Sequence, residues 1–281
     1  MDLCQNDPGR MRAARRLNGA TGVLAASVLL DSAVEHYRGS FANPAMILPL
    51  IVSSMTIGVS AHGFIDKRPG AHRIRGLTYG AAMVTGLFGA GFHVYNLLKR
   101  PGALSLQNLF YGAPLGAPMA LLLAGLLGSA AERTRNDPAI RGRIGRRIGR
   151  RIGMGRLVGL VSGLGLLGTS AEAGLLHFRG AFHNPAMFAP VTIPPVGGAL
   201  LLNSLRGRGG WMSRLWLRLT AALGLAGIGF HAWGVHRNMG GWRNWRQNLL
   251  NGPPVPAPPS FLGLSLAGIA ALDLLDLRCD E

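Results

Sequence analysis

Four histidines occur as two matching pairs, His36 with His93 and His177 with His231. Each lies close to one end of a long apolar stretch, where an imidazole can meet a partner from a neighbouring helix. Imidazole nitrogen is a common ligand of iron, copper and zinc. Helical bundles also build cofactor sites, haem included, from side chains on facing helices. We therefore expect these four residues to bind haem b or, alternatively, a transition metal.

Glycines cluster immediately before the second histidine of each pair. Because glycine has no side chain, this pattern predicts space for a macrocycle beside His93 and beside His231. The glycines concerned are Gly86, Gly89, Gly91, Gly224, Gly227 and Gly229.

A carboxylate stands five residues before the first histidine of each pair, Asp31 before His36 and Glu172 before His177. Five residues turn an α-helix by about 500°, so carboxylate and imidazole leave different faces of the helix. A charge at the centre of a bilayer costs about 2.5–3.5 kcal/mol on insertion scales, which makes such residues functional candidates. We expect Asp31 and Glu172 to orient the ligands or to handle protons.

Polar amides are shared by the two parts of the chain in the same way. Asn43-Pro44 and Asn184-Pro185 fit a helix start, with Asn as the cap and Pro as the first helical residue. Four further amides stand in connecting loops, where we expect them to support the site or to bind a polar headgroup. They are Gln107, Asn108, Gln247 and Asn248.

These residues belong to three motifs that occur twice in the chain in the same order. What the copies share is polar, or is Gly and Pro, whereas the apolar stretches between the motifs differ freely. The copies are 36–46 with 177–187, 86–93 with 224–231, and 107–118 with 247–258. The sequence therefore predicts an internal duplication.

Eight stretches are long and apolar enough to cross about 30 Å of hydrocarbon, which takes about 20 helical residues. The chain is 48% hydrophobic and only 15% charged, whereas charged residues approach a quarter of a soluble domain. The stretches are 17–37, 44–65, 77–98, 112–131, 157–177, 185–205, 215–236 and 252–275. The expected fold is all-α, a polytopic membrane protein whose eight transmembrane helices form two four-helix repeats. The repeats are parallel, with the same orientation, because four spans return the chain to the side where it started.

This organisation has five parts. They are an N-terminal cytoplasmic segment 1–16, a first four-helix repeat 17–131, an Arg-rich cytoplasmic linker 132–156, a second four-helix repeat 157–275 and a cytoplasmic tail 276–281. Basic residues favour the side of the termini, because only seven of the 29 Lys and Arg residues fall on the other side. The positive-inside rule then places both termini in the cytoplasm, and we expect a bacterial-type inner membrane. The seven are Arg38, Lys99, Arg100, Arg179, Arg237, Arg243 and Arg246.

The Arg-rich linker could suggest nucleic-acid binding, but a segment lying on anionic lipid is the simpler interpretation, at about 1 kcal/mol for each basic residue. No nucleic-acid partner is therefore expected. The cysteines, Cys4 and Cys279, stand at opposite ends of the sequence. That spacing excludes a disulfide framework and a Cys-based zinc site.

The leading functional hypothesis is a membrane redox subunit that passes electrons between a periplasmic partner and quinone, alone or within a larger membrane complex. A proton- or cation-coupled secondary transporter that uses Asp31 and Glu172 is the first alternative. The second alternative is a non-catalytic scaffold or assembly factor with packing histidines. No hydrolase or P-loop motif is present, and whether the chain is an enzyme stays open.

Overall fold

The computed structural model describes residues 8–112, 114–135, 153–207 and 210–277, and within them every regular element is a helix. Apolar residues dominate the long helices. The first half contains α1 (Pro8–Arg38), η1 (Pro44–Ile47), α2 (Leu48–Ile65), α3 (Arg73–Leu98), α4 (Leu106–Tyr111) and α5 (Gly116–Arg135). The second half contains α7 (Met154–Arg179), η3 (Pro185–Phe188), α8 (Ala189–Ser204), α9 (Trp211–His236), η4 (Gly241–Asn244), α10 (Trp245–Asn251) and α11 (Pro259–Asp276).

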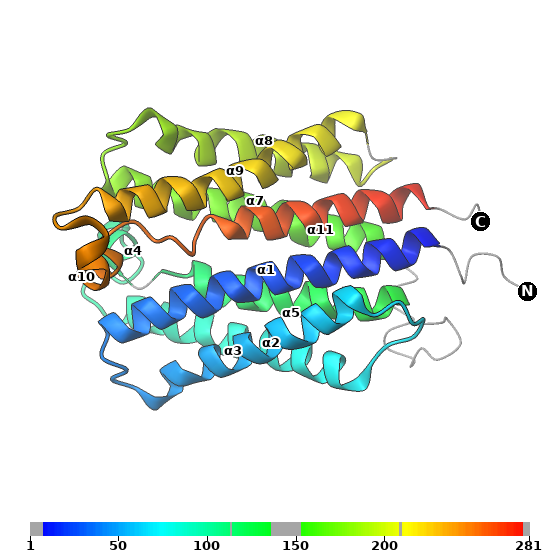
Figure 1. Ribbon diagram of the computed structural model, residues 1–281, viewed down its shortest axis with the longest axis horizontal. Helices are drawn as coiled ribbons and strands as arrows, with labels where there is room; N and C mark the ends of the chain where they lie inside the picture. The colour runs from blue at the N-terminus through cyan, green and yellow to red at the C-terminus, as the bar shows by residue number, and fades with distance from the viewer. Residues whose placement is uncertain (1–7, 113, 136–152, 208–209, 278–281) are drawn as a thin grey trace, which may run out of the picture.

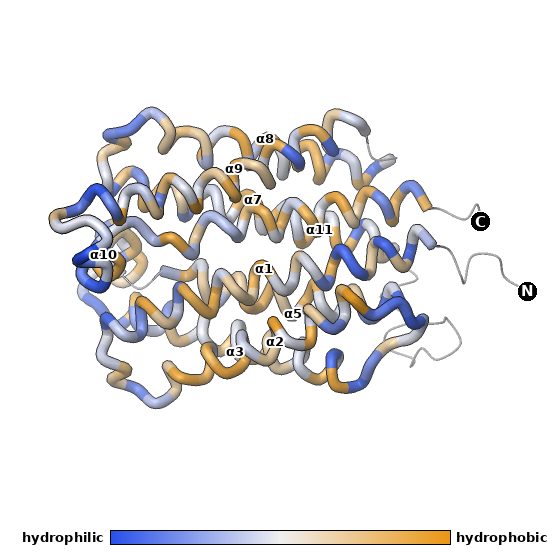
Figure 2. The backbone as a smooth tube through the Cα atoms, viewed as in Figure 1, coloured by the Kyte–Doolittle hydropathy of each residue, from blue (hydrophilic) through white to orange (hydrophobic). Residues whose placement is uncertain are grey.

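The long helices run side by side, and the hydrophilic residues gather at the two ends of the bundle (Figure 2). Among the described residues, seven helices are long and apolar enough to cross a membrane. Large apolar side chains such as Leu87, Phe88 and Leu225 are exposed on the flanks, as expected for surfaces that meet lipid. The chain is therefore a multi-pass membrane protein by the length and composition of its helices.

The eighth predicted span, 112–131, corresponds to α5, which is not among the seven. Its last turn carries Glu132, Arg133 and Arg135, and these charges lower its hydropathy. The helix nevertheless runs alongside the others (Figure 1). An ion cluster described below accommodates Glu132 and Arg135.

Predicted and observed boundaries differ most at the N-terminus. The first predicted span starts at residue 17, where an apolar run follows Arg15 and Arg16, but α1 begins at Pro8. At 1.5 Å per residue its 31 residues extend about 46 Å, which carries the arginines beyond a hydrocarbon layer of about 30 Å. Much of the predicted linker 132–156 and tail 276–281, together with Cys4 and Cys279, lies outside the described residues.

The two halves meet along α1 and α11, which pack against each other at the centre of the bundle (Figure 1). α2 and α5 flank α1, and α7 and α9 flank α11. Small and aliphatic side chains fill the centre, including Leu24, Leu166 and Leu264, none more than 1% exposed. The first and last described residues lie at one end of the bundle, here called the terminus end, and α4 and α10 lie at the other, the α4/α10 end.

Candidate functional site: paired histidines at the α4/α10 end

A strained turn follows the first histidine of each pair. After His36 the chain reverses through Ser40 and Phe41, which have φ values of 55° and 47°. Ala181 and Phe182 repeat this conformation with φ values of 55° and 46°. A non-glycine residue in the left-handed region costs about 1–2 kcal/mol, and such strain concentrates at functional sites. The turn holds a local contact in place, since Phe41 N–H donates to the His36 carbonyl at 3.0 Å.

The Asn-Pro motifs start the next helix, as the sequence predicts. The Asn43 side chain accepts a hydrogen bond from Ala45 N–H at 2.9 Å, with Pro44 at the first helical position. Asn184 and Ala186 repeat the contact at 2.9 Å. The predicted helix starts are confirmed, and these two amides are occupied as caps.

All four shared histidines turn the same ring nitrogen towards a backbone carbonyl. Because a carbonyl can only accept, each Nδ1 donates and each Nε2 is left with its lone pair in the neutral ring. This arrangement fixes the tautomer and orientation that metal-bound histidines have in proteins. The pairs are His36 with Met46 at 2.6 Å, His93 with Pro114 at 2.5 Å, His177 with Met187 at 2.8 Å, and His231 with Pro254 at 2.7 Å.

These contacts explain why the three motifs occur together in each half. The loop motif that contains His36 also supplies its acceptor, the Met46 carbonyl. The acceptor for His93 comes instead from the third motif, through Pro114. The segment after α4 therefore orients a histidine on α3, a relation that spacing alone does not reveal.

In the second half, the histidines of α7 and α9 come together. The ring centres of His177 and His231 are 6.4 Å apart and the ring planes are inclined by 64°. Two imidazoles that bind one metal ion from opposite sides, each through a bond of about 2.0–2.1 Å, have ring centres about 6 Å apart. In the first half, the described residues show no such ring contact between His36 and His93, and the ring beside His36 is that of Phe41, with ring centres 6.2 Å apart. All four residues are half-buried.

Gly86 and Gly224, two of the glycines before His93 and His231, pack against a neighbouring helix, so at these two positions the expected space for a macrocycle is not present. A Cβ on Gly86 would lie 2.4 Å from the Leu122 nitrogen, and one on Gly224 would lie 2.8 Å from the Leu262 nitrogen. These glycines let α3 cross α5, and α9 cross α11, at backbone contact. At Gly91 and Gly229 a Cβ would meet nothing within 4 Å.

Glu172 has a partner in the other half of the chain, and Asp31 lies within reach of its charge. Glu172, on α7, accepts a hydrogen bond from Gly116 N–H at 2.9 Å and so caps the N-terminus of α5. The position equivalent to Gly116 in the second half is Pro256, which has no N–H to offer Asp31. Asp31 instead lies within electrostatic reach of Glu35 and Glu172.

The loop asparagines have a structural role that the sequence did not reveal. Asn108 Nδ2 donates to the carbonyls of Pro101 and Ala103 at 2.9 and 2.8 Å. Asn248 Nδ2 likewise donates to two carbonyls of its own loop, at 3.2 and 2.9 Å. Both amides close the connection that precedes their short helix, whereas Gln107 and Gln247 are exposed.

The ligand set limits which group the pairs can hold. Within the described part of the chain, no three His, Cys, Asp or Glu side chains are placed to hold a metal ion together. A bare transition metal takes four or more ligands. Haem iron needs only axial ligands from the protein. The pair of His177 and His231 offers two imidazole ligands.

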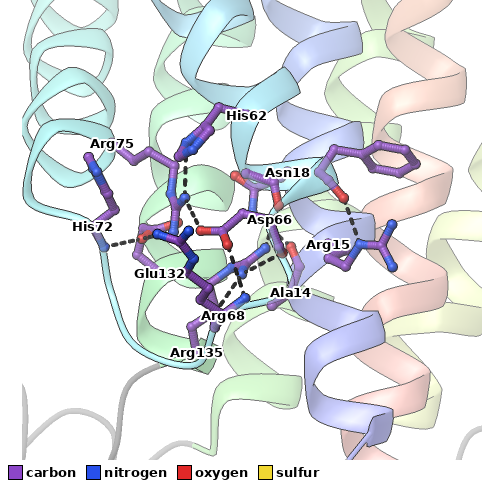
Figure 3. Close-up of polar contacts among 12 residues, drawn as sticks. Ala14, Arg15, Asn18, His62, Asp66, Arg68, His72, Arg75, Glu132 and Arg135 are labelled. Carbon is purple, nitrogen blue, oxygen red and sulfur yellow. Dashed lines mark hydrogen bonds and ion pairs between the residues drawn. The ribbon is translucent and has the colours of Figure 1, made fainter.

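A second cluster of ionisable residues lies at the terminus end (Figure 3). The Arg75 guanidinium, 1% exposed, pairs with Glu132 at 2.8 Å and Asp66 at 2.8 Å, and Nη1 also donates to His62 Nδ1 at 3.2 Å. Arg135 donates to the carbonyls of Gly63 and Asp66. The hydrogen bond from Arg75 lowers the pKa of Asp66 to about 2.

This cluster belongs to the first half, so the motifs that the two halves share do not mark it. The positions equivalent to Arg75 and Glu132 in the second half are Ser213 and Leu272, so no shared motif marks them. The signal that was present is the ionisable residue itself, since a charge close to a membrane-spanning segment requires a partner.

Comparison with known proteins assigns no relationship. No protein-family model matches the chain, and no curated protein or solved structure is significantly similar to it. Function therefore has to be argued from the geometry of the molecule.

Proposed function

We propose that the chain is a membrane redox subunit in which each half binds haem b iron through a histidine pair at the α4/α10 end. The observation that carries this proposal is the geometry of His177 and His231. Their ring centres are 6.4 Å apart, and both Nδ1 atoms donate to backbone carbonyls. The Nε2 atoms are then available as ligands. Bound haem would supply a one-electron couple, and the protein would supply the axial ligands.

We also propose the number and arrangement of the membrane spans. α5 completes the first set of four spans, giving eight in two repeats of the same orientation. The equivalent turns at Ser40 and Ala181 and the equivalent crossings at Gly86 and Gly224 support this duplication.

The basic residues at the terminus end support cytoplasmic termini in a bacterial-type inner membrane. The histidine pairs then lie near the periplasmic surface. Electrons would pass between a periplasmic protein and quinone, within a larger complex if one forms.

The experiment is an absorption spectrum with iron, copper and zinc analysis of the full chain purified in detergent. The expected result is a haem spectrum that changes on reduction and loses about half its intensity in His231→Ala. His183→Ala is the matched control, because His183 is exposed and its Nδ1 meets the Gly180 carbonyl of its own loop at 2.9 Å.

Two other outcomes would overturn the haem proposal. Stoichiometric metal without haem would assign the same histidines to a bare metal ion. Protein free of any cofactor, with unchanged stability after replacement of all four histidines, would favour a scaffold.

One observation favours a second candidate, a proton- or cation-coupled transporter. Asp31 and Glu172 approach each other where the two halves meet, close enough for their charges to interact, and carboxylates between repeats are typical of secondary transporters. Uptake of a proton or cation into liposomes that is lost in Asp31→Asn, but kept in Glu35→Gln, would support this candidate.

A further inference from the structure

The terminus end contains a cavity of about 340 Å³, formed by the end of α2, the loop 66–72 and the start of α3. Cavities of a few hundred Å³ accommodate small ligands and lipid headgroups. Its polar lining residues are His62, Asp66, Arg68, His72 and Arg75. At the positions of His62, Asp66 and Arg75 the second half has Asn203, Gly207 and Ser213, so these three ionisable residues belong to the first half.

The lining presents hydrogen-bond donors to the cavity. A guanidinium does not deprotonate in proteins, so His62 Nδ1, which faces Arg75 Nη1 at 3.2 Å, must be the acceptor. The neutral His62 ring then carries its proton on Nε2 and is a donor there. The His72 ring lies beside it, with ring centres 5.5 Å apart.

The charge around the cavity is positive. The two arginines of the ion cluster, Arg75 and Arg135, balance its two carboxylates. Asp66, the acidic residue of the lining, accepts hydrogen bonds from Arg75 at 2.8 Å and from the Arg68 backbone N–H at 3.0 Å. This second contact, with the bond from Arg135 to the Arg68 carbonyl at 3.3 Å, fixes the loop that carries Arg68. Arg68, whose side chain is exposed, lines the cavity, with Lys67 and Arg73 nearby in sequence, and these three residues supply its positive charge.

We propose that this cavity binds a phosphate-bearing anion through Arg68 and His62. Basic pockets between transmembrane helices at a membrane surface recognise anionic headgroups, and arginine binds phosphate oxygens with paired donors. The phosphate belongs either to a lipid headgroup or to a soluble molecule.

Native mass spectrometry of the full chain in detergent tests this assignment. The probes are phosphatidylglycerol, phosphatidylcholine and inorganic phosphate. One phosphatidylglycerol should bind at least tenfold more tightly than phosphatidylcholine, and Arg68→Gln should weaken it about tenfold, as expected for a lost charge-assisted hydrogen bond. Arg206→Gln, with the same charge change in the matching loop of the second half, should stay within twofold.

Competition with inorganic phosphate distinguishes the two sources. Displacement of the lipid assigns the site to the phosphate group alone, and retention assigns it to the lipid headgroup. Equal affinity for the two lipids, no loss in Arg68→Gln, or an equal loss in Arg206→Gln would overturn the proposal. His62→Gln provides a second variant for the same comparison if Arg68→Gln fails to fold.

Discussion

The two ends of the bundle differ in how the halves of the chain use them. At the α4/α10 end, His36 and His177 make the same contact with a carbonyl ten residues later, to Met46 and to Met187. At the terminus end, the first half buries a network around Arg75, whereas the equivalent position in the second half is Ser213. The halves are therefore alike at one end and different at the other, which points to a paired role for the first and a single role for the second.

Removing one partner of the buried ion cluster should give the largest loss of stability. Glu132→Leu copies the residue of the second half, Leu272, but leaves the Arg75 guanidinium buried without its bidentate partner. Breaking a buried pair from one side costs about 3–5 kcal/mol, so the unfolding free energy in detergent should fall by that amount.

Arg214→Ala is the comparison at the same end of the second half. Arg214 pairs with Asp273 and Asp276, and its side chain is 24% exposed, so the loss should be about 1 kcal/mol or less. Equal losses in the two variants would show that the cluster around Arg75 is not distinct from an ordinary surface pair.

Adding a side chain at the helix crossings found in both halves should give the next largest loss of stability. Gly86→Ala places a Cβ 2.4 Å from the Leu122 nitrogen, so α3 and α5 must separate, and we expect a loss of about 1–3 kcal/mol. Gly91→Ala meets no atom within 4 Å and should be neutral or slightly stabilising. Thermal melting of both variants in detergent checks this, and equal melting temperatures would contradict the crossing.

Acid should weaken the terminus end through Asp66. Its pKa is lowered from 3.8 to about 2 by the hydrogen bond from Arg75, so its contribution to stability is complete above pH 3.8 and disappears as the pH falls towards 2. Between pH 5 and pH 2.5 the melting temperature of the wild type should fall roughly 5 °C further than that of Asp66→Asn. Parallel curves would show that Asp66 gains nothing from its ion pair.

Relieving the strained turns should give the smallest change in stability. Ala181 has a φ of 55°, and glycine adopts this conformation without the steric cost of a Cβ. Ala181→Gly should therefore raise the unfolding free energy by about 1 kcal/mol, and Ser40→Gly should do the same in the first half. A destabilised variant in chemical denaturation would show that the turn is not strained.

The sequence predicted the features that depend on local pattern. Apolar length located the helices, and Asn43-Pro44 located a helix start whose cap the structure confirms. The sequence did not predict contacts between residues that are distant in the chain. Nothing in the spacing shows that Pro114 supplies a carbonyl to His93, or that Glu172 caps a helix of the other half.

Two further differences have physical causes. The glycines before His93 were assigned to cofactor space because their neighbours were unknown, and the structure shows α5 against Gly86. The cluster around Arg75 was not predicted, because a comparison of the two halves detects only residues that both halves share. In both cases the role of the residues depends on tertiary contacts, which the sequence does not show.

The stoichiometry of bound haem tests the paired-histidine site most directly. Because each half holds one pair, the wild-type chain purified in detergent should contain two haem irons. His93→Ala and His231→Ala should each contain one, and the double variant none. A cofactor-free wild type, or haem that stays in the double variant, would contradict the assignment of these histidines as ligands.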